Sequence, residues 1–430
     1  MSRLRVCYVY DACYPEMNGG AERRYHELAV RLAADHDIQY VTWSHHGRAA
    51  RWTANGVRYW GVGRPPAFYG SDGKRRVSEA VVFAARLVPT LLRIRADVLD
   101  VSATPTVPLY GVWLAATLTR TPLVVTWHEY WAEHWHAYLP ESRLIATIAR
   151  ILEAGSRLAG DCIVVVSPYT ASRMGEGRWA PKITIVGNGA DVAEIAAAEP
   201  AAEPVDLVYL GRLIDEKRVE LLVRAVAQLA VEQPTVCATV IGEGPERLRL
   251  QALALQLGVA ARIRFTGPLS TAEVRSVLRA ATALVLPSAR EGYGIVVVEA
   301  QAAGAIPIVT SGPATAAPTL VDHAVDGFVV EATPDAIAGA YRVLRDDPSR
   351  RAQMRASAAE RARAASWDAV AARMAEVYLA AARRGIRDRA RARPGASTTS
   401  LSGAGREPLL GMDQVRNGQS ASPVRRSPSR

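Results

Sequence analysis

Short apolar runs along the chain alternate with longer segments in which apolar residues recur at helical spacing. In the first half, the runs predict strands near 4–10, 38–43, 97–101, 122–127, 161–166 and 183–186. The segments between them predict helices near 20–34, 77–94, 140–157 and 168–175. Because strands that alternate with amphipathic helices are typical of parallel α/β units, we expect this half to form a doubly wound sheet.

The second half repeats the pattern, with strands predicted near 205–210, 235–241, 262–266, 283–287, 306–309 and 327–330. Helices are predicted near 217–232, 245–257, 271–280, 294–303 and 334–346, and the proline-containing segment 192–204 is the expected linker. The predicted fold class is therefore α/β, with two doubly wound Rossmann-like domains at residues 1–195 and 196–365. Such sheets bind ligands beyond the carboxyl ends of their strands, so we expect a cleft where the domains face each other.

The last part of the chain predicts a helix at 366–384 that packs back on the first domain, followed by a disordered basic tail at 385–430. Residues 381–430 contain eleven arginines and three acidic residues, a charge of +8, so only +2 of the total of +10 lies in residues 1–380. Ser, Gly, Pro and Arg without periodicity are typical of disorder. The charge therefore indicates no nucleic-acid partner. An inert tail is the favoured interpretation, and weak peripheral contact of the tail with an anionic membrane is the alternative.

The composition is that of a soluble globular protein with two domains, since 430 residues are 49% apolar and 22% charged. The opening "MSRLRVCYVYDA" lacks the features of a signal peptide. The longest uncharged stretch, 101–119, contains Pro105 and Pro108 and is a poor membrane span. The four cysteines are scattered without a CxxC pair, so we expect free thiols and a cytoplasmic protein.

Gly19 and Gly20 directly precede the first predicted helix. A glycine pair lets a ligand approach backbone amides at the positive end of a helix, which suits phosphate; a simple turn is the alternative. The surrounding residues match neither GxGxxG nor the Walker pattern, so the sequence does not support those nucleotide-binding classes.

Two cations follow the first predicted strand of the second half. Arg212 comes just after this strand, and Lys217 is expected at the start of the next helix, so both lie at the carboxyl edge of the sheet. Such a pair fits a diphosphate, because arginine offers a planar fork and lysine a compact charge. A solvated helix start, paired with Asp215 and Glu216, is the alternative. The chain contains only three lysines, which adds some weight to the first interpretation.

The stretch "EGYGIVVVEA" places Glu291 and Glu299 on either side of two glycines, a tyrosine and an apolar run. A solvated helix would spread its carboxylates and a buried strand would exclude them. The pattern therefore indicates a loop leading into a helix whose first turn faces a polar ligand; two ordinary surface acids are the alternative.

Taken in order, these motifs resemble those of a known enzyme family. "GRLIDEK", "VIGEGPERLRLQALALQLGVAARIRFTGPLS" and "ALVLPSAREGYGIVVVEAQAAGAIPIV" look like the nucleotide-sugar domain of retaining glycosyltransferases of the family 4 type (glycosyl transferases group 1), which have the GT-B fold. "NGGAERRYHELAVRLA" and "VGNGAD", which contains Asn188, are similar to the family's first domain. The motifs span most of residues 4–380. Arg218 is a departure, because the family commonly has glycine there, and its side chain could narrow the phosphate pocket.

The resemblance implies roles for these residues. Glu299 would accept hydrogen bonds from the ribose hydroxyls of a nucleotide-sugar donor, and Glu291 would lie near the transferred sugar. Arg212 and Lys217 would neutralise the diphosphate in place of a metal ion. The implied donor-binding set is Gly19, Gly20, Asn188, Arg212, Lys217, Glu291, Gly292, Tyr293, Gly294 and Glu299. The implied donor is a UDP- or GDP-sugar, with no metal or other cofactor.

The stretch "VVTWHEYWAEHWHAYLP" at 124–140 is the most unusual in the first half. It is not an HExxH zinc motif, because residue 132 is alanine. By resemblance, His128 touches the donor sugar near the reacting carbon, and the implied catalytic set is His128, Glu291, Arg212 and Lys217. The aromatic residues suit either stacking on an acceptor sugar or aglycone, or packing between loop and helix. Asp35-His36-Asp37 resembles a DxD metal motif, but a solvated loop is the better interpretation.

The family resemblance implies sugar transfer to an acceptor hydroxyl with retention of configuration, by a same-face mechanism in which the departing phosphate oxygen takes the acceptor proton. The acceptor would be a sugar, a lipid-linked molecule or a small molecule. The arginine-rich composition suggests a GC-rich bacterial genome, where cell-envelope glycans, glycolipids and glycosylated metabolites are all plausible products. Two alternatives remain open: a sugar-nucleotide epimerase of the same fold, and a non-catalytic nucleotide-sugar-binding protein.

Overall fold

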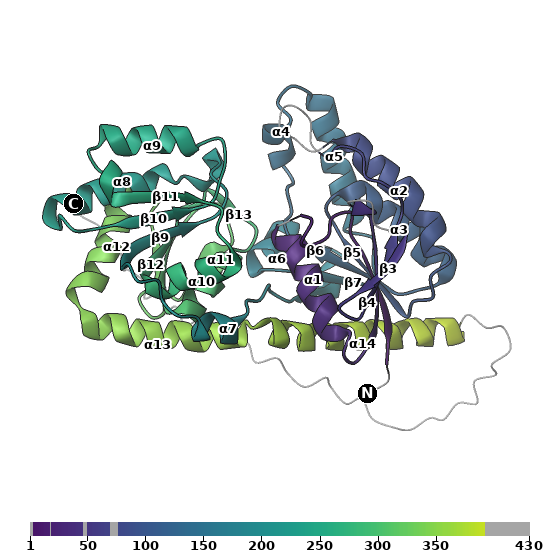
Figure 1. Ribbon diagram of the computed structural model, residues 1–430. Coiled ribbons are helices and arrows are strands. Elements are labelled where there is room, and N and C mark those ends of the chain that lie inside the picture. Colours follow the sequence, from purple (N-terminus) through teal and green to yellow (C-terminus); the bar gives the residue numbers. More distant parts are fainter. Residues whose placement is uncertain (1–2, 18, 46–49, 69–75, 392–430) are drawn as a thin grey trace, which may run out of the picture.

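The computed structural model describes residues 3–17, 19–45, 50–68 and 76–391, and the side chains up to residue 386. They form two α/β domains side by side, the first in purple and blue and the second in teal and green (Figure 1). The chain passes between the domains twice, and the two crossing segments meet at a bridge between Ala190 and Ser366. Most of the predicted basic tail, from residue 392 onward, lies outside the described residues.

The first domain is built on an eight-stranded sheet in the order β3-β4-β2-β1-β5-β6-β7-β8. Neighbouring strands are parallel, except that β3 runs antiparallel to β4. The strands are β1 (Arg5–Val9), β2 (Asp37–Thr42), β3 (Arg51–Ala54), β4 (Val57–Gly61), β5 (Val98–Ser102), β6 (Leu123–Trp127), β7 (Cys162–Val165) and β8 (Ile183–Ile185). The central strands β5 and β6 are buried along their whole length, as expected for strands with helices on both faces.

The helices of this domain are α1 (Gly20–Leu32), α2 (Val77–Leu91), α3 (Thr106–Thr119), α4 (His134–Tyr138), α5 (Arg143–Ser156) and α6 (Pro168–Met174). The sequence analysis predicted no helix at α3. Pro105 is its N-cap and Pro108 lies in its first turn, where proline needs no amide partner, so the two prolines begin the helix instead of breaking it. Within the described part of the chain, no helix combines the length and the apolar character needed to cross a bilayer.

The second domain contains a six-stranded parallel sheet in the order β11-β10-β9-β12-β14-β16. Its strands are β9 (Val205–Leu210), β10 (Ala238–Ile241), β11 (Ile263–Gly267), β12 (Ala281–Leu286), β14 (Ile306–Thr310) and β16 (Phe328–Val330), and β13 (Arg290–Glu291) pairs separately with β15 (Ala314–Thr315). Its helices are α7 (Val192–Ala197), α8 (Glu220–Glu232), α9 (Arg247–Gln256), α10 (Thr271–Ala280), α11 (Ile295–Ala303), α12 (Pro334–Asp346) and α13 (Pro348–Ala364). Two of them were not predicted: α7 occupies the expected linker, and α13 had no counterpart.

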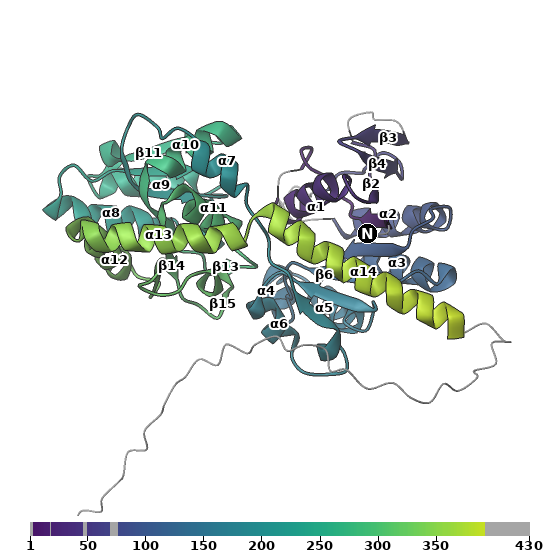
Figure 2. The same ribbon diagram turned by 90° about the horizontal axis from the view of Figure 1, so that it is seen from below.

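Helix α14 (Trp367–Arg391) returns to the first domain and continues past the predicted end at residue 384. Figure 2 shows α13 and α14 following one another across both domains. Trp367, Met374 and Tyr378 of α14 are fully buried and complete, together with α1, the apolar core on one face of the first sheet. Helices α2 and α3 cover the core on the opposite face. The first domain therefore needs the last described helix of the chain to close its core.

Candidate active site

The cleft between the domains contains two adjoining cavities, an inner one of about 320 Å³ and an outer one of about 390 Å³. The residues that line both cavities are Gly20, Leu210, Gly211, Ile295 and Val296. Leu210 ends β9 and Leu286 ends β12, so the inner cavity lies at the carboxyl edge of the second sheet, where parallel sheets bind ligands. A third cavity, of about 440 Å³, lies at the start of β6, at the amino edge of the first sheet. None of the predicted site residues lines it.

The inner cavity brings together the predicted cations and one of the predicted acids. Lys217 Nζ lies 2.6 Å from Glu291 Oε2, and the two side chains are 17% and 19% exposed. Lys217 is in a 3-10 turn (Asp215–Lys217) before α8, instead of starting the helix as predicted. Arg212 also lines this cavity, and its carbonyl accepts a hydrogen bond of 2.9 Å from Tyr209 Oη. Two cations and a carboxylate therefore line the inner cavity, which suits a ligand carrying both phosphate and hydroxyl groups.

Arg218, where the family commonly has glycine, has a left-handed backbone with φ of +48°. Glycine adopts this conformation without strain, which explains the preference. The Arg218 side chain is exposed and lines neither cavity of the cleft, so the expected narrowing of the phosphate pocket is not seen.

The glycines of "EGYG" allow the second domain to approach the first. A Cβ atom on Gly292 would lie 2.7 Å from the carbonyl oxygen of His128, at the end of β6. Gly294 is the N-cap of α11 with φ of +98°, a conformation that favours glycine. The first-turn amides of α11 thus face the inner cavity, which Ile295 and Val296 line.

Tyr293 and Asn188 line the inner cavity, but their polar groups connect the two domains. Tyr293 Oη donates a 2.8 Å hydrogen bond to the carbonyl of Asn188, and burial raises the pKa of Tyr293 to about 12. Asn188 Oδ1 accepts a 3.0 Å hydrogen bond from the fully buried Arg24. Both residues therefore support the cleft in addition to bordering it.

His128 lies at the inner cavity with its Nε2 atom enclosed, and this atom has no hydrogen-bond partner among the described residues. Burial, aided by the charge of Arg24, lowers the pKa of His128 to about 3. The imidazole is therefore neutral at physiological pH, with an unpaired ring nitrogen enclosed beside the cavity.

Glu299 lines the outer cavity on α11 and is only 7% exposed. Its Oε1 atom forms a 2.6 Å ion pair with Arg23 of α1, across the cleft. Arg23 also contacts Asp191, which forms ion pairs with Arg31 and Arg275 as well. Gly19 and Gly20 lie beside this cluster, at the start of α1 and on the wall of the outer cavity.

Three arginines at the cleft were not predicted from the sequence. Arg23 and Arg275 line the outer cavity, and Arg290 bridges to the first domain through a 2.5 Å ion pair with Glu129. Arg23 could have been found, because it follows the Gly-Gly pair by one helical turn. Arg275 and Arg290 carry no such signal in a chain so rich in arginine.

The aromatic stretch after β6 is held mainly by packing. The buried carboxylate of Glu153 accepts hydrogen bonds from the amides of Trp131 and Ala132 and from Trp135 Nε1, at 2.7–3.1 Å. Trp131 stacks under the guanidinium of Arg290 at 3.9 Å and against Trp135. These contacts favour the packing interpretation and place the stretch beside the cleft.

No group of three or more His, Cys, Asp or Glu side chains in the described parts of the chain is arranged to hold a metal ion. The Asp35-His36-Asp37 run is structural, since His36 Nδ1 accepts from the amide of Leu4 and Asp37 pairs with Arg58.

Two family profiles match the chain. The one described as Glycosyltransferase Family 4 matches residues 18–194, and the one described as Glycosyl transferases group 1 matches residues 191–361. Glycogen synthase of Mycobacterium tuberculosis is 28% identical over 400 residues, spanning 88% of this chain and 95% of that protein. D-inositol 3-phosphate glycosyltransferase of Kineococcus radiotolerans is 31% identical over 316 residues, spanning 65% of this chain and 69% of that protein.

Solved structures share the architecture. Sucrose-phosphate synthase from Thermosynechococcus elongatus superposes with a TM-score of 0.71 at 19% identity, covering 88% of this chain and 98% of that one. The Anabaena protein HepE, in complex with UDP and glucose, superposes with a TM-score of 0.67 at 18% identity, covering 87% and 99%. The predicted fold of two Rossmann-like domains is thus confirmed. The chain belongs to the family 4 (group 1) glycosyltransferases, enzymes of the GT-B fold that transfer sugars.

Proposed function

We propose that the protein transfers a sugar from a nucleoside-diphosphate donor to an acceptor hydroxyl with retention of configuration. The observation that carries this proposal is the inner cavity, where Arg212, Lys217 and Glu291 converge and which continues into the outer cavity beside Glu299. The two cavities together suit a two-part donor, with the sugar diphosphate in the inner one and the nucleoside in the outer one.

In this proposal the bond between the anomeric carbon and the diphosphate oxygen breaks first. Arg212 and Lys217 neutralise the charge that develops on the diphosphate, aided by the first-turn amides of α11. The acceptor oxygen then bonds to the anomeric carbon on the face that the diphosphate leaves. Its proton passes to the departing phosphate oxygen, so that no carboxylate nucleophile is needed.

The remaining residues position the donor. Glu291 holds Lys217 and offers its carboxylate to the sugar hydroxyls, while neutral His128, on the wall of the inner cavity, contacts the sugar near the reacting carbon. Glu299 accepts hydrogen bonds from the ribose. Because cationic side chains stand where the diphosphate would bind, we propose that transfer needs no metal ion.

A UDP- or GDP-sugar remains our proposed donor, and the complex of HepE with UDP and glucose supports the first of these. The acceptor is proposed to be a sugar, a lipid-linked molecule or a small molecule. Names such as glycogen synthase and D-inositol 3-phosphate glycosyltransferase among the relatives are consistent with an acceptor that carries free hydroxyls.

The donor site can be tested by thermal shift with UDP, GDP, ADP and dTDP on the wild type, on Glu299→Gln and on Glu360→Gln, which alters an exposed acid of α13. We expect one nucleotide to raise Tm for the wild type and Glu360→Gln but not for Glu299→Gln, since a ligand of the folded state stabilises it. Equal shifts for all three proteins would argue against the ribose role of Glu299.

The reaction can be tested by incubating the nucleotide-sugar of that base with candidate acceptors, with and without EDTA, and assigning the anomeric configuration of the product by NMR. An inverted product would rule out the same-face mechanism. Conversion of the donor to another nucleotide-sugar without acceptor would identify an epimerase. Binding without turnover of any donor would identify a non-catalytic protein.

A further inference from the structure

Large apolar side chains are exposed mainly on one layer of the molecule. Of the eighteen that the described residues expose, twelve lie on α2, α3, α5 or the residues just after them. They are Val77, Val81, Val82, Leu92, Trp113, Leu114, Leu118, Leu144, Ile145, Ile148, Ile151 and Leu158. The whole second domain exposes only four, so exposure on this scale is not a general property of the surface.

Helices α2 and α3 cover the face of the first sheet opposite α1 and α14, and α5 adjoins α3 in the same layer. α2 and α3 meet at Gly111, where a Cβ atom would lie 3.3 Å from the carbonyl of Ala84. α3 and α5 are joined by the 2.8 Å hydrogen bond from Tyr110 Oη to the carbonyl of Leu152. Figure 1 shows α2, α3 and α5 side by side on the outer flank of the first domain.

The apolar positions of α5 define a stripe on its outer side. Leu144, Ile148 and Ile151 recur at helical spacing and are exposed by 72%, 48% and 63% of their surface. Arg143 and Arg150 are exposed on the same helix. A stripe of large aliphatic residues with arginines beside it is the pattern of a helix that lies in the interface of a bilayer.

The exposed charges on the three helices are positive, although Glu141, one residue before the N-cap of α5, is also exposed. Along residues 76–95, 106–120 and 142–158, every exposed charged residue is an arginine. The two acids of these segments, Glu79 and Glu153, are buried, and they accept hydrogen bonds from Trp43 Nε1 and from the loop after β6. A surface that combines exposed aliphatic groups with helices whose exposed charges are arginines complements anionic lipid headgroups over hydrocarbon.

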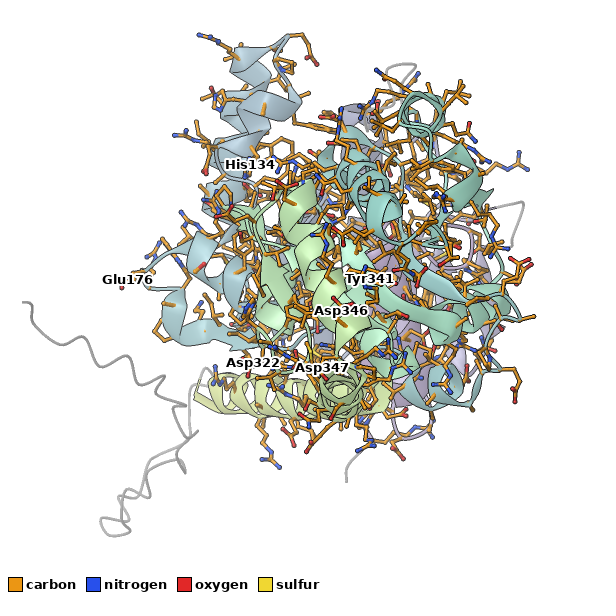
Figure 3. All side chains as sticks on the ribbon, turned by 90° about the vertical axis from the view of Figure 1, so that its left-hand side faces the viewer. His134, Glu176, Asp322, Tyr341, Asp346 and Asp347 are labelled. Atoms are coloured by element: carbon orange, nitrogen blue, oxygen red, sulfur yellow. The ribbon has the colours of Figure 1, made fainter. Side chains whose placement is uncertain are left out.

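The layer also borders the cleft. The start of α5 packs against α4, where His136 Nε2 lies 3.3 Å from Thr147 Oγ1, and α4 belongs to the aromatic stretch that contacts Arg290 at the cleft. Figure 3, in which His134 marks α4, shows this end of the first domain standing clear of the second domain. A bilayer in contact with α5 would therefore lie next to the opening of the cleft.

We propose that the outer layer formed by α2, α3 and α5 docks the protein on an anionic lipid bilayer, with α5 in the headgroup region. This inference rests on exposure and charge and does not require the proposed reaction. It would deliver a lipid-linked acceptor to the cleft, and it assigns membrane contact to the folded first domain instead of the C-terminal tail.

The test is co-sedimentation of the full chain with sucrose-loaded vesicles of phosphatidylcholine alone and of phosphatidylcholine with one quarter phosphatidylglycerol. We expect binding to the anionic vesicles only, reduced by raising NaCl from 0.1 to 0.5 M because salt screens the arginines. Both Leu144→Ser/Ile148→Ser/Ile151→Ser and Arg143→Glu/Arg150→Glu should lower the partition coefficient at least tenfold.

Two controls make the result specific. Leu248→Ser/Leu255→Ser changes equally exposed apolar residues on α9 of the second domain, and a chain ending at Arg391 removes the basic tail. Both should bind as the wild type does. Circular dichroism should give the same Tm for the α5 variants as for the wild type, because the altered side chains are exposed.

Four outcomes would overturn the proposal. Wild-type protein that binds neither vesicle, or α5 variants that bind normally, would show that this layer does not dock on lipid. Loss of binding only on tail deletion would assign the contact to the tail. A wild-type dimer by light scattering that the α5 variants convert to a monomer, without vesicle binding, would identify the layer as an interface between two copies. None of these outcomes bears on the transfer reaction.

Discussion

At the scale of single residues, the ion pair between Glu299 and Arg23 joins the two domains across the cleft. Glu299 is nearly buried, and its carboxylate is held by an arginine of the opposite domain. Ribose hydroxyls would compete with Arg23 for the same oxygen. A carboxylate held this way stays in place when no ligand is bound, at the cost of that competition.

Arg23→Ala should therefore have two opposite effects. The unliganded protein should lose about 1–3 kcal/mol of stability, because a buried carboxylate loses its charged partner. The Tm increase caused by the cognate nucleotide should become larger, since the competitor is gone. Arg31→Ala is the matched control, because Arg31 pairs with Asp191 but not with Glu299. A smaller nucleotide shift in Arg23→Ala would mean that Arg23 itself binds the donor.

His128 gives a prediction about pH. Burial lowers the pKa of His128 from 6.5 to about 3. Between these pH values the unfolded chain therefore binds a proton that the folded protein does not bind. Stability should therefore fall as pH drops from 7 to 5, by about 1–2 kcal/mol from this residue. Urea unfolding at both pH values should give a smaller loss for His128→Gln. Burial raises the pKa of Asp100 to about 6, so protonation of Asp100 stabilises the folded protein as pH falls. This contribution is the same in the wild type and in His128→Gln.

The control for this measurement is His323→Gln, which alters an exposed histidine of the second domain and should keep the wild-type loss. Equal losses for wild type and His128→Gln would show that folding does not lower the pKa of His128, and the burial argument for a neutral imidazole would then fail.

At the scale of elements, the loop that leads into α11 governs how closely the domains approach. Gly292→Ala would place a methyl group 2.7 Å from the carbonyl of His128, so the end of β6 and this loop must separate. We expect the transfer rate to fall at least tenfold, because the proposed catalytic groups come from both sides of this contact. Gly339→Ala in α12 meets no atom within 4 Å and should instead stabilise the protein by up to about 1 kcal/mol with full activity.

An initial-rate assay with saturating donor would measure both variants, and circular dichroism would confirm that each is folded. Full activity in Gly292→Ala would show that the two loops can separate without consequence, and the close approach would then have no catalytic role.

The elements that the sequence predicted are those with a clear apolar period. The buried runs of β1, β6 and β9 and the amphipathic helices α1 and α8 carry it plainly. The hairpin of β3 and β4 was missed, because its strands are interrupted by arginines, although Asn55 and Gly56 form the left-handed two-residue turn that such hairpins favour. Helix α13 was missed because its buried side is made mostly of alanines, which give little contrast.

The candidate site was predictable to the extent that it depends on motifs. Arg212, Lys217, Glu291 and the EGYG glycines lie together at the inner cavity, as the family resemblance implied. The ion pairs of Glu299 and Arg290 could not be predicted from the sequence, because each joins residues of different domains. Sequence spacing carries no information about such contacts.

At the scale of the whole molecule, Asp191 lies where the chain first crosses between domains and binds arginines of both. Arg23 and Arg31 come from α1, and Arg275 comes from α10. Beside it, Ala190 pairs with Ser366 of the returning segment. The two crossings and this cluster together fix the angle between the domains.

Asp191→Ala should lower the free energy of unfolding by about 1–3 kcal/mol, because three arginines lose a largely buried anion. It should also make the segment near 186–204 more sensitive to limited proteolysis. Asp368→Ala is the control, since Asp368 pairs with Arg31 but is highly exposed, and its loss should cost less than about 1 kcal/mol. Equal effects of the two changes would show that the cluster contributes no more than a surface pair.

The return of α14 to the first domain has a consequence for how the protein is made. Tyr378, Trp367 and the other buried residues of α14 fill a core whose remaining members precede residue 187, so synthesis must pass the second domain and α14 before this core can close. Until then, the sheet face that α14 covers remains apolar and open, and the nascent first domain is a target for chaperones and for self-association. The second domain, whose core clusters within residues 166–362, can fold earlier even though it is synthesised later than most of the first.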